Sequence, residues 1–238
     1  MSERLKKFAK KYNHIWILSY GFLYLIWFTY LEKNVTTEYT PMYCKLDDYI
    51  PFNEIFVIPY CLWFFYVAIF VAIFFFLDKK EYYRFCSFLF VGMSICLLIC
   101  TLFPNGQDLR PTTFARDNAL VDMVKSFYTT DTSTNVFPSI HCFNSIVIAI
   151  AVYKSTHLRK LKHYKALLIG CILLSLSIML STVFIKQHSI LDMFGALALS
   201  ACMYPFIYTN IFSKNKQTNL DEVPTNTNIN NDQPVEEI

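Results

Sequence analysis

The chain has 238 residues, of which 55% are hydrophobic and 16% charged, and its formal net charge is +3. Soluble domains carry about 25% charged residues, so this composition argues against a soluble globular protein. The small net charge also gives no reason to expect a nucleic-acid partner.

Uncharged runs that are long enough to cross a membrane recur along the chain. They cover residues 15–31, 55–77, 85–103, 166–185 and 193–212. Each is close to the roughly twenty residues that a helix needs to cross the hydrocarbon core. A sixth run, residues 139–153, is shorter. Apolar runs of this length can form all their backbone hydrogen bonds in lipid only as helices. We therefore expect an all-α integral membrane bundle of about six transmembrane helices.

The domain organisation follows from where these runs end. We expect a transmembrane domain over residues 1–212 and a disordered cytoplasmic tail over residues 213–238. The tail is rich in Asn, Thr, Asp and Glu, and such a segment cannot bury a core. The first run is longer than the apolar part of a usual signal peptide, so we interpret it as a retained span.

Lysine and arginine gather on one side of the membrane if the six spans alternate in direction. The basic clusters precede the first span, separate the second from the third and the fourth from the fifth, and follow the sixth; they include Lys6, Lys7, Lys79, Lys80, Arg159, Lys160, Lys214 and Lys216. Cytoplasmic loops carry such an excess. We therefore expect a multi-pass protein with both termini in the cytoplasm and with residues 32–54, 104–138 and 186–189 on the extracytoplasmic side.

Two histidines lie where these outer loops meet an apolar run. His141 ends the segment 137–141, and His188 lies within the segment 186–192 together with Asp192. On a helix, His188 and Asp192 share a face. A carboxylate bound to one imidazole nitrogen leaves the other free as a nucleophile or base. A purely structural pair at a helix end is the alternative interpretation.

Groups that suit a phosphoryl ligand lie near these histidines. Arg110 can bind two phosphate oxygens at once, Lys186 adds a positive charge, and Ser139 adds a hydroxyl at the start of the fourth span. Counted in chain order, the fourth span (residues 139–153) and the sixth span (residues 193–212) both start at the outer face. Helix N-termini at that face favour phosphate oxygens. Phosphoryl transfer needs such positioning and cationic stabilisation. The pattern therefore indicates a phosphoryl-transfer site at a membrane surface.

A metal centre is the competing interpretation of the same residues. His141, His188 and Asp192 have the right chemistry for three zinc ligands, but Arg110 and Lys186 beside them would repel a cation. The eight cysteines show no zinc-binding spacing, and six of them lie within apolar runs, where cysteine behaves as a small hydrophobe. We expect no metal and no other cofactor.

At these residues the sequence resembles the type 2 phosphatidic acid phosphatase superfamily, the lipid phosphate phosphatases. Arg110-Pro111 matches the end of the first family motif. Residues 138–141, Pro-Ser-Ile-His, match the second motif, Pro-Ser-Gly-His, except at Ile140. Ser181, His188 and Asp192 match the spacing of the third motif, Ser-Arg-x5-His-x3-Asp. The resemblance runs from the third span to the sixth.

The resemblance implies a role for each matching residue. His188 would attack phosphorus and form a phosphohistidine, Asp192 would orient it, and His141 would protonate the leaving oxygen. Arg110, Ser139 and the backbone amide of Ile140 would hold the phosphoryl group.

The sequence departs from the family pattern at two cations and one glycine. Phe103 and Thr182 stand where the motifs have lysine and arginine, so Lys186 and Arg116 are the expected substitutes. Ile140 in place of glycine looks like the branch that contains inositol phosphorylceramide synthase, whose members pass a phosphoryl head group to a lipid.

Together, these features predict a membrane lipid phosphatase acting on phosphatidate, phosphatidylglycerophosphate or a polyprenyl diphosphate. The first alternative is a lipid phosphotransferase that moves a phosphoryl head group to a lipid alcohol. The second is a non-enzymatic transporter or receptor with a degenerate site. The expected partners are the lipid phosphate substrate and membrane lipids. The sequence leaves the oligomeric state, the acceptor and the exact lipid open.

Overall fold

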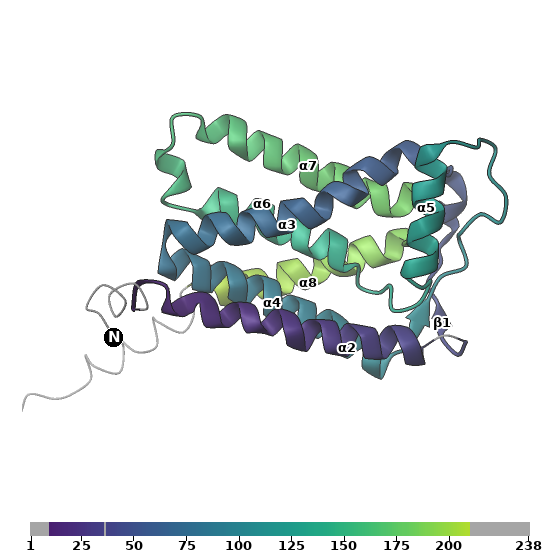
Figure 1. The fold of residues 1–238 in the computed structure, drawn as a ribbon, viewed down its shortest axis with the longest axis horizontal. Coiled ribbons are helices and arrows are strands. Elements are labelled where there is room, and N and C mark those ends of the chain that lie inside the picture. The colour runs from purple at the N-terminus through teal and green to yellow at the C-terminus, as the bar shows by residue number, and fades with distance from the viewer. Residues whose placement is uncertain (1–9, 36, 210–238) are drawn as a thin grey trace, which may run out of the picture.

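The computed structural model describes residues 10–35 and 37–209, which fold as helices running side by side (Figure 1). Five of these helical segments are long and apolar enough to cross a membrane: Asn13–Asn34, Glu54–Leu77, Lys79–Leu102, Tyr164–Phe184 and Ile190–Tyr208. A sixth apolar helix, Ile140–Lys154, is shorter. The predicted all-α membrane bundle is confirmed. The expected tail, residues 213–238, and the basic residues of the N-terminus and tail, Lys6, Lys7, Lys214 and Lys216, lie outside the described residues.

The helices that build the bundle are numbered along the chain as in Figure 1. The α-helices are α2 (Tyr20–Asn34), α3 (Val57–Leu77), α4 (Lys79–Leu102), α5 (Ala119–Thr130), α6 (Ile140–Lys154), α7 (Tyr164–Phe184) and α8 (Ile190–Tyr208). Four 3-10 helices cover Asn13–Ser19, Lys45–Tyr49, Glu54–Phe56 and Leu158–Lys160. Two short strands, β1 (Thr40–Pro41) and β2 (Asn105–Gly106), pair in parallel.

The short helix α6 lies at the centre of the bundle, in contact with α3, α4, α7 and α8. Its side chains Phe143, Val147 and Ile148 are fully buried. Gly195 on α8 lets the segment before α6 come close, since a Cβ there would lie 2.4 Å from the ring of Phe137. The start of α6 is therefore fixed against α8, and this brings the two histidine segments together.

Helix α5 lies across one end of the bundle (Figure 1), in a stretch that the sequence analysis treated as a loop. Asn118 caps it by accepting from the N–H groups of Leu120 and Val121. Val121 and Val124 are buried on its inner side. The cap residue and the i, i+3 spacing of these valines were signals in the sequence that could have predicted this helix.

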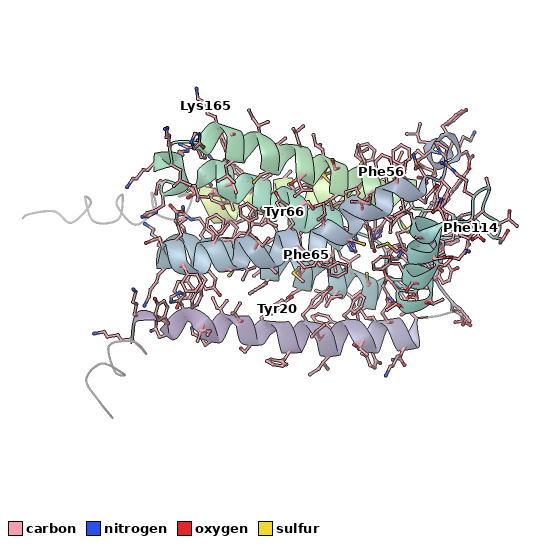
Figure 2. The ribbon with its side chains drawn as sticks, turned by 45° about the horizontal axis from the view of Figure 1, so that its top comes forward. Tyr20, Phe56, Phe65, Tyr66, Phe114 and Lys165 are labelled. Carbon is pink, nitrogen blue, oxygen red and sulfur yellow. The ribbon has the colours of Figure 1, made fainter. Side chains whose placement is uncertain are left out.

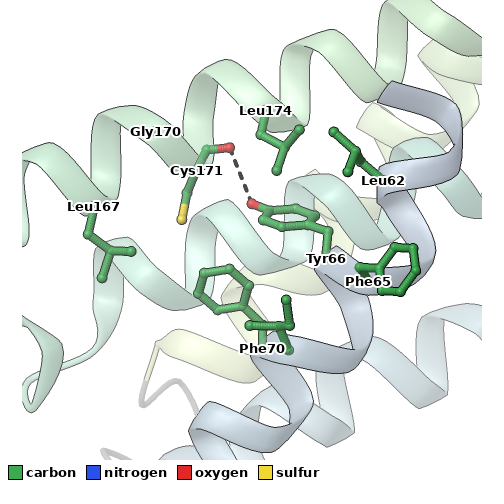
Figure 3. Close-up of a pocket in the computed structure, with 9 residues that line it drawn as sticks. Leu62, Phe65, Tyr66, Phe70, Leu167, Gly170, Cys171 and Leu174 are labelled. Atoms are coloured by element: carbon green, nitrogen blue, oxygen red, sulfur yellow. Dashed lines mark hydrogen bonds between the residues drawn. The ribbon is translucent and has the colours of Figure 1, made fainter. Parts of the chain in front are cut away.

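The two ends of the bundle carry different side chains. Phe114, in the loop before α5, lies at one end, and Lys165, at the start of α7, lies at the other (Figure 2). The middle is apolar, as expected for a surface that faces lipid. Between α3 and α7 lies an open, apolar groove of about 320 Å³, where the Tyr66 hydroxyl donates to the Cys171 carbonyl at 3.2 Å (Figure 3). The residues that line this groove include no histidine, carboxylate, lysine or arginine.

Candidate active site

The predicted pair of His188 and Asp192 is formed, at the end of the bundle where α5 lies. The His188 Nδ1 and Asp192 Oδ2 atoms are 3.1 Å apart. The His188 side chain is 9% exposed and that of Asp192 is fully buried. A buried carboxylate at this distance fixes the imidazole with Nδ1–H toward Asp192. The other ring nitrogen, Nε2, has no protein partner among the described residues and remains available for chemistry.

The turn between α7 and α8 holds this pair in place. The Thr182 carbonyl accepts the N–H groups of Gln187 and His188 at 2.9 and 3.0 Å. Lys186 makes the turn possible by adopting a left-handed backbone with φ 55°. Asp192 also accepts the Ser189 N–H at 2.9 Å, which closes a capping box at the start of α8. Thr182, at the place of the family arginine, therefore has a backbone role in this chain.

His141, the second predicted histidine, lies beside His188 across a small space. Their ring centroids are 5.9 Å apart and the planes are inclined by 61°. His141 stacks on Tyr60, at 4.6 Å between centroids, and contacts Trp63 at 4.2 Å. Its Nε2 atom is buried and has no hydrogen-bond partner among the residues that the structure describes. The aromatic contacts therefore hold the ring in place and leave this nitrogen unpaired.

Both histidines line one cavity of about 300 Å³. One wall is aromatic and apolar, and the other is polar; the lining residues on the polar side are Thr130, Asp131, Thr132, Thr134, Asn135 and Gln187. On the apolar side, Leu25 of α2 and Phe64 of α3 line the cavity and are 57% and 51% exposed on the lipid-facing surface. The cavity therefore lies between the membrane-facing surface and the polar end of the bundle.

The two helix N-termini that were expected to bind phosphate differ. At α8, the carboxylate of Asp47 already accepts the Ile190 N–H at 2.9 Å and the Ser189 hydroxyl at 2.6 Å. The expectation is therefore wrong for α8, because the 3-10 helix Lys45–Tyr49 brings its own anion there. This helix belongs to the segment 32–54, which was expected on the extracytoplasmic side.

The start of α6 is less occupied. Ser139, which is fully buried, accepts the Cys142 N–H on its hydroxyl, and its N–H donates to the Asp192 carbonyl at 3.1 Å. The first intrahelical bond runs from the Phe143 N–H to the Ser139 carbonyl. These bonds leave the backbone N–H groups of Ile140 and His141 without a partner among the described residues. Both residues line the cavity. Ser139 itself acts here as a helix cap, and its predicted contact with phosphate remains a prediction.

Arg110 lies next to the cavity but does not line it. Its guanidinium donates to the carbonyls of Tyr128, Asp131 and Thr132 at 3.0, 2.8 and 2.8 Å and to the side chain of Gln187. Only its buried Nε has no partner. Burial lowers the pKa of Arg110 from its ordinary value, against the opposing effect of Asp131. In this conformation Arg110 fixes the loop that follows α5, and its role as a phosphate clamp stays a prediction.

The two expected substitutes for the missing cations point elsewhere. The Lys186 Nζ donates to the Asp47 carbonyl at 2.9 Å, and burial lowers its pKa. Arg116 pairs with Glu54, at 3.2 Å between its Nε and the carboxylate. Neither residue lines the cavity.

Asp131 and Gln187 are site residues that the sequence analysis missed. Gln187 accepts from Arg110 and donates to the Asp131 carboxylate at 3.2 Å, so it connects the cation to the cavity wall. Burial, and next the charge of Glu32, raise the pKa of Asp131 to about 6. The position of Gln187 directly before His188 was the one feature of the sequence that could have predicted its place in the site. Asp131 lies outside every motif.

Comparison with known proteins gives one match. The family model described as the PAP2 superfamily matches residues 87–216, which is more than half of the chain and contains both histidines, Asp192, Arg110 and Asp131. No curated protein and no solved structure matched the chain.

Proposed function

Since this chain belongs to the PAP2 superfamily, whose members are generally phosphatases and phosphotransferases, we propose that it is a membrane lipid phosphatase working through a phosphohistidine on His188. Membership of the superfamily supports phosphatase-type activity on lipid phosphates in general. The observation that carries the more specific proposal is the buried pair of His188 and Asp192 facing a cavity that also contains His141.

The proposed reaction has two steps. In the first, the His188 Nε2 attacks phosphorus, the bond from phosphorus to the lipid oxygen breaks, and His141, in its protonated form, gives a proton to that oxygen. In the second, His141 takes a proton from water, the water oxygen binds phosphorus, and the bond to His188 breaks. Inorganic phosphate leaves, and both histidines return to their starting state.

The shape of the cavity supports a lipid substrate. Leu25 and Phe64 line it and are also exposed on the lipid-facing surface, so acyl chains can remain in the membrane while the phosphate reaches the histidines. Phosphatidate, phosphatidylglycerophosphate and polyprenyl diphosphate all have this form. We further propose that both termini are cytoplasmic and that the cavity opens on the extracytoplasmic side, because the described basic residues around the α3–α4 and α6–α7 connections, such as Lys79 and Lys160, lie at the opposite end of the bundle.

The second candidate function is lipid phosphotransfer. The same opening toward lipid that admits a substrate would admit a lipid alcohol as the acceptor in the second step. Water and a lipid alcohol would then compete for the phosphohistidine, and the first step would be common to both functions. Ile140 in place of the motif glycine, which resembles the branch that contains inositol phosphorylceramide synthase, favours this alternative.

The test is to incubate the purified protein with a panel of radiolabelled lipid phosphates, with and without lipid alcohols. Release of free phosphate supports the phosphatase, and a labelled new lipid supports the phosphotransferase. Acid-labile label on His188 is expected in both cases. Absence of label and product with every lipid, from protein that still binds these lipids, would favour a transporter or receptor with a degenerate site.

A further inference from the structure

The cavity has an unusual charge for a site that receives phosphate. No lysine or arginine of the described chain lines it. The charged or titratable groups on its wall are Asp131, Tyr24, Tyr60, His141 and His188. The positive charges nearby are directed into protein contacts, Arg110 toward loop carbonyls and Lys186 toward the Asp47 carbonyl.

Asp131 lines this cavity, and only one of its two carboxylate oxygens is hydrogen-bonded within the described residues. Its Oδ2 accepts the Tyr60 hydroxyl at 3.3 Å and the Gln187 amide at 3.2 Å. Its Oδ1 has no hydrogen-bond partner within the residues that the structure describes. Because Asp131 lines the same cavity as His188, its carboxylate lies close to the place that an incoming phosphoryl group would occupy.

Titratable and charged groups surround Asp131 on several elements. They are Glu32 and Tyr24 of α2, Tyr60 of α3, Arg110 of the preceding loop, Tyr128 of α5, His141 of α6 and His188 before α8. Glu32 binds the Thr132 N–H and hydroxyl at 2.9 and 2.6 Å, so its negative charge is fixed one residue away from Asp131. Arg110 faces the Asp131 carbonyl, while the carboxylate is turned toward Gln187.

We propose that Asp131 is a specificity-determining residue that makes the cavity select phosphoryl groups with one negative charge over those with two. The favoured ligands are lipid phosphodiesters and singly ionised phosphate monoesters. This inference rests on the proposed function, since it concerns the substrate of the same site.

The physical reason is repulsion in a partly buried place. Two like charges brought together away from water cost several kcal/mol, and a doubly ionised phosphate meets this cost twice as strongly as a singly ionised one. Protein cations that would offset it do not line the cavity. The two histidines can supply positive charge, but only while they are protonated.

The pH dependence has a definite sign. Burial and Glu32 raise the pKa of Asp131 to about 6, so the carboxyl is neutral below that pH and charged above it. A phosphate monoester also loses its second proton near pH 6. The affinity for a monoester should therefore fall steeply as pH rises through 6. A diester keeps one charge throughout, so its affinity should fall less.

The experiment uses two ligands that differ by one methyl group and one charge: dioctanoyl phosphatidate and its methyl diester, dioctanoyl phosphatidylmethanol. Binding to the full chain is measured by calorimetry at pH 5 and pH 8, in a His188→Gln background that cannot form the phosphoenzyme. Asp131→Asn removes the charge with little change in shape. Asp122→Asn, which removes an exposed carboxylate from the preceding helix α5, is the matched control.

At pH 8 the diester is expected to bind at least about tenfold more tightly than the monoester. Asp131→Asn should reduce that ratio to about threefold or less, mainly by tightening the monoester, and Asp122→Asn should leave it unchanged. Equal binding of the two ligands at pH 8, or a ratio that Asp131→Asn does not alter, overturns the proposal. So does loss of both ligands in Asp131→Asn, because the residue would then serve the fold.

A second measurement on the chain with native Asp131 does not depend on how that variant folds. The diester-to-monoester affinity ratio should rise by about tenfold between pH 5 and pH 8, and a constant ratio would also overturn the proposal. Failure of the proposed function is recognised separately: the chain with native His188 would then give no phosphohistidine with either lipid, whatever the binding ratio.

Discussion

The part of the chain that the structure describes contains two histidine–carboxylate pairs, one at each end of the bundle. His188 and Asp192 are 3.1 Å apart at the end where α5 lies, and His157 and Glu81 are 3.0 Å apart at the other end. In each pair the carboxylate lies in the first turn of a helix and the bond reaches Nδ1. By distance and atom type alone, the two pairs are equivalent.

Their surroundings are very different. The His157 side chain is 40% exposed, whereas that of His188 is 9% exposed and lines a cavity with a second histidine. Glu81 also binds Ser155 and Thr156 and so ties the loop between α6 and α7 to α4. We therefore treat a histidine–carboxylate pair as a candidate catalytic site only where, as at His188, it also faces a cavity and a second histidine. The pair of His157 and Glu81 stabilises the loop between α6 and α7.

The strongest test of this difference replaces the histidine of each pair. His188→Ala should lower turnover by about four orders of magnitude or more and abolish phosphohistidine, because Nε2 is the proposed nucleophile. His157→Ala should change turnover by less than about threefold. Rapid quench and scintillation counting of the acid-labile phosphoenzyme provide the measurement. Phosphohistidine in the His188→Ala protein would refute the assignment.

Replacing His141 separates the proton donor from the nucleophile. His141→Ala should slow release of a lipid alcohol by roughly 10²- to 10⁴-fold, because an alkoxide leaves poorly without a proton. With p-nitrophenyl phosphate, whose leaving group needs no proton, the loss should be small. The ratio of kcat/KM for the two substrates is the readout. An equal loss on both would show that His141 holds the site together instead of donating a proton.

The carboxylates of the two pairs should affect different properties. Asp192→Asn should lower kcat by about 100-fold or more, because the amide can favour the wrong imidazole tautomer. Glu81→Gln should leave kcat nearly unchanged and lower the free energy of unfolding by about 1–3 kcal/mol, since hydrogen bonds to a charged group are lost. Kinetics and denaturation in detergent measure both effects. If Glu81→Gln abolished activity at unchanged stability, the structural role of the second pair would be wrong.

The smallest effect on activity is expected from labels that report which side of the membrane each pair faces. Single cysteines at Asp117, 93% exposed beside α5, and at Lys160, in the loop that contains His157, should leave turnover unchanged in a cysteine-free variant. An impermeant maleimide should label the first in intact cells and the second only after permeabilisation. The reverse pattern would place the proposed active site in the cytoplasm.

The sequence determined the parts of this protein that depend on local composition and spacing. Long uncharged runs can satisfy their backbone in lipid only as helices, so the membrane bundle and its short sixth helix at Ile140–Lys154 followed from the chain itself. The spacing of His188 and Asp192 also predicted their contact, although His188 lies in the turn just before α8 and not on the helix itself. Helix α5 could also have been predicted from local signals, the Asn118 cap and the spacing of Val121 and Val124, but the sequence analysis did not use them.

Only the tertiary structure decided the contacts between segments far apart in the chain. Asp47 occupies the N-terminus of α8, Arg110 binds the carbonyls of the loop after α5, and Asp131 joins the cavity wall. Each of these places depends on packing across more than twenty residues of sequence, for which no periodicity or motif gives a rule. The histidines were identified from their local spacing, while the charge of the cavity around them is set by which distant side chains the bundle turns toward it.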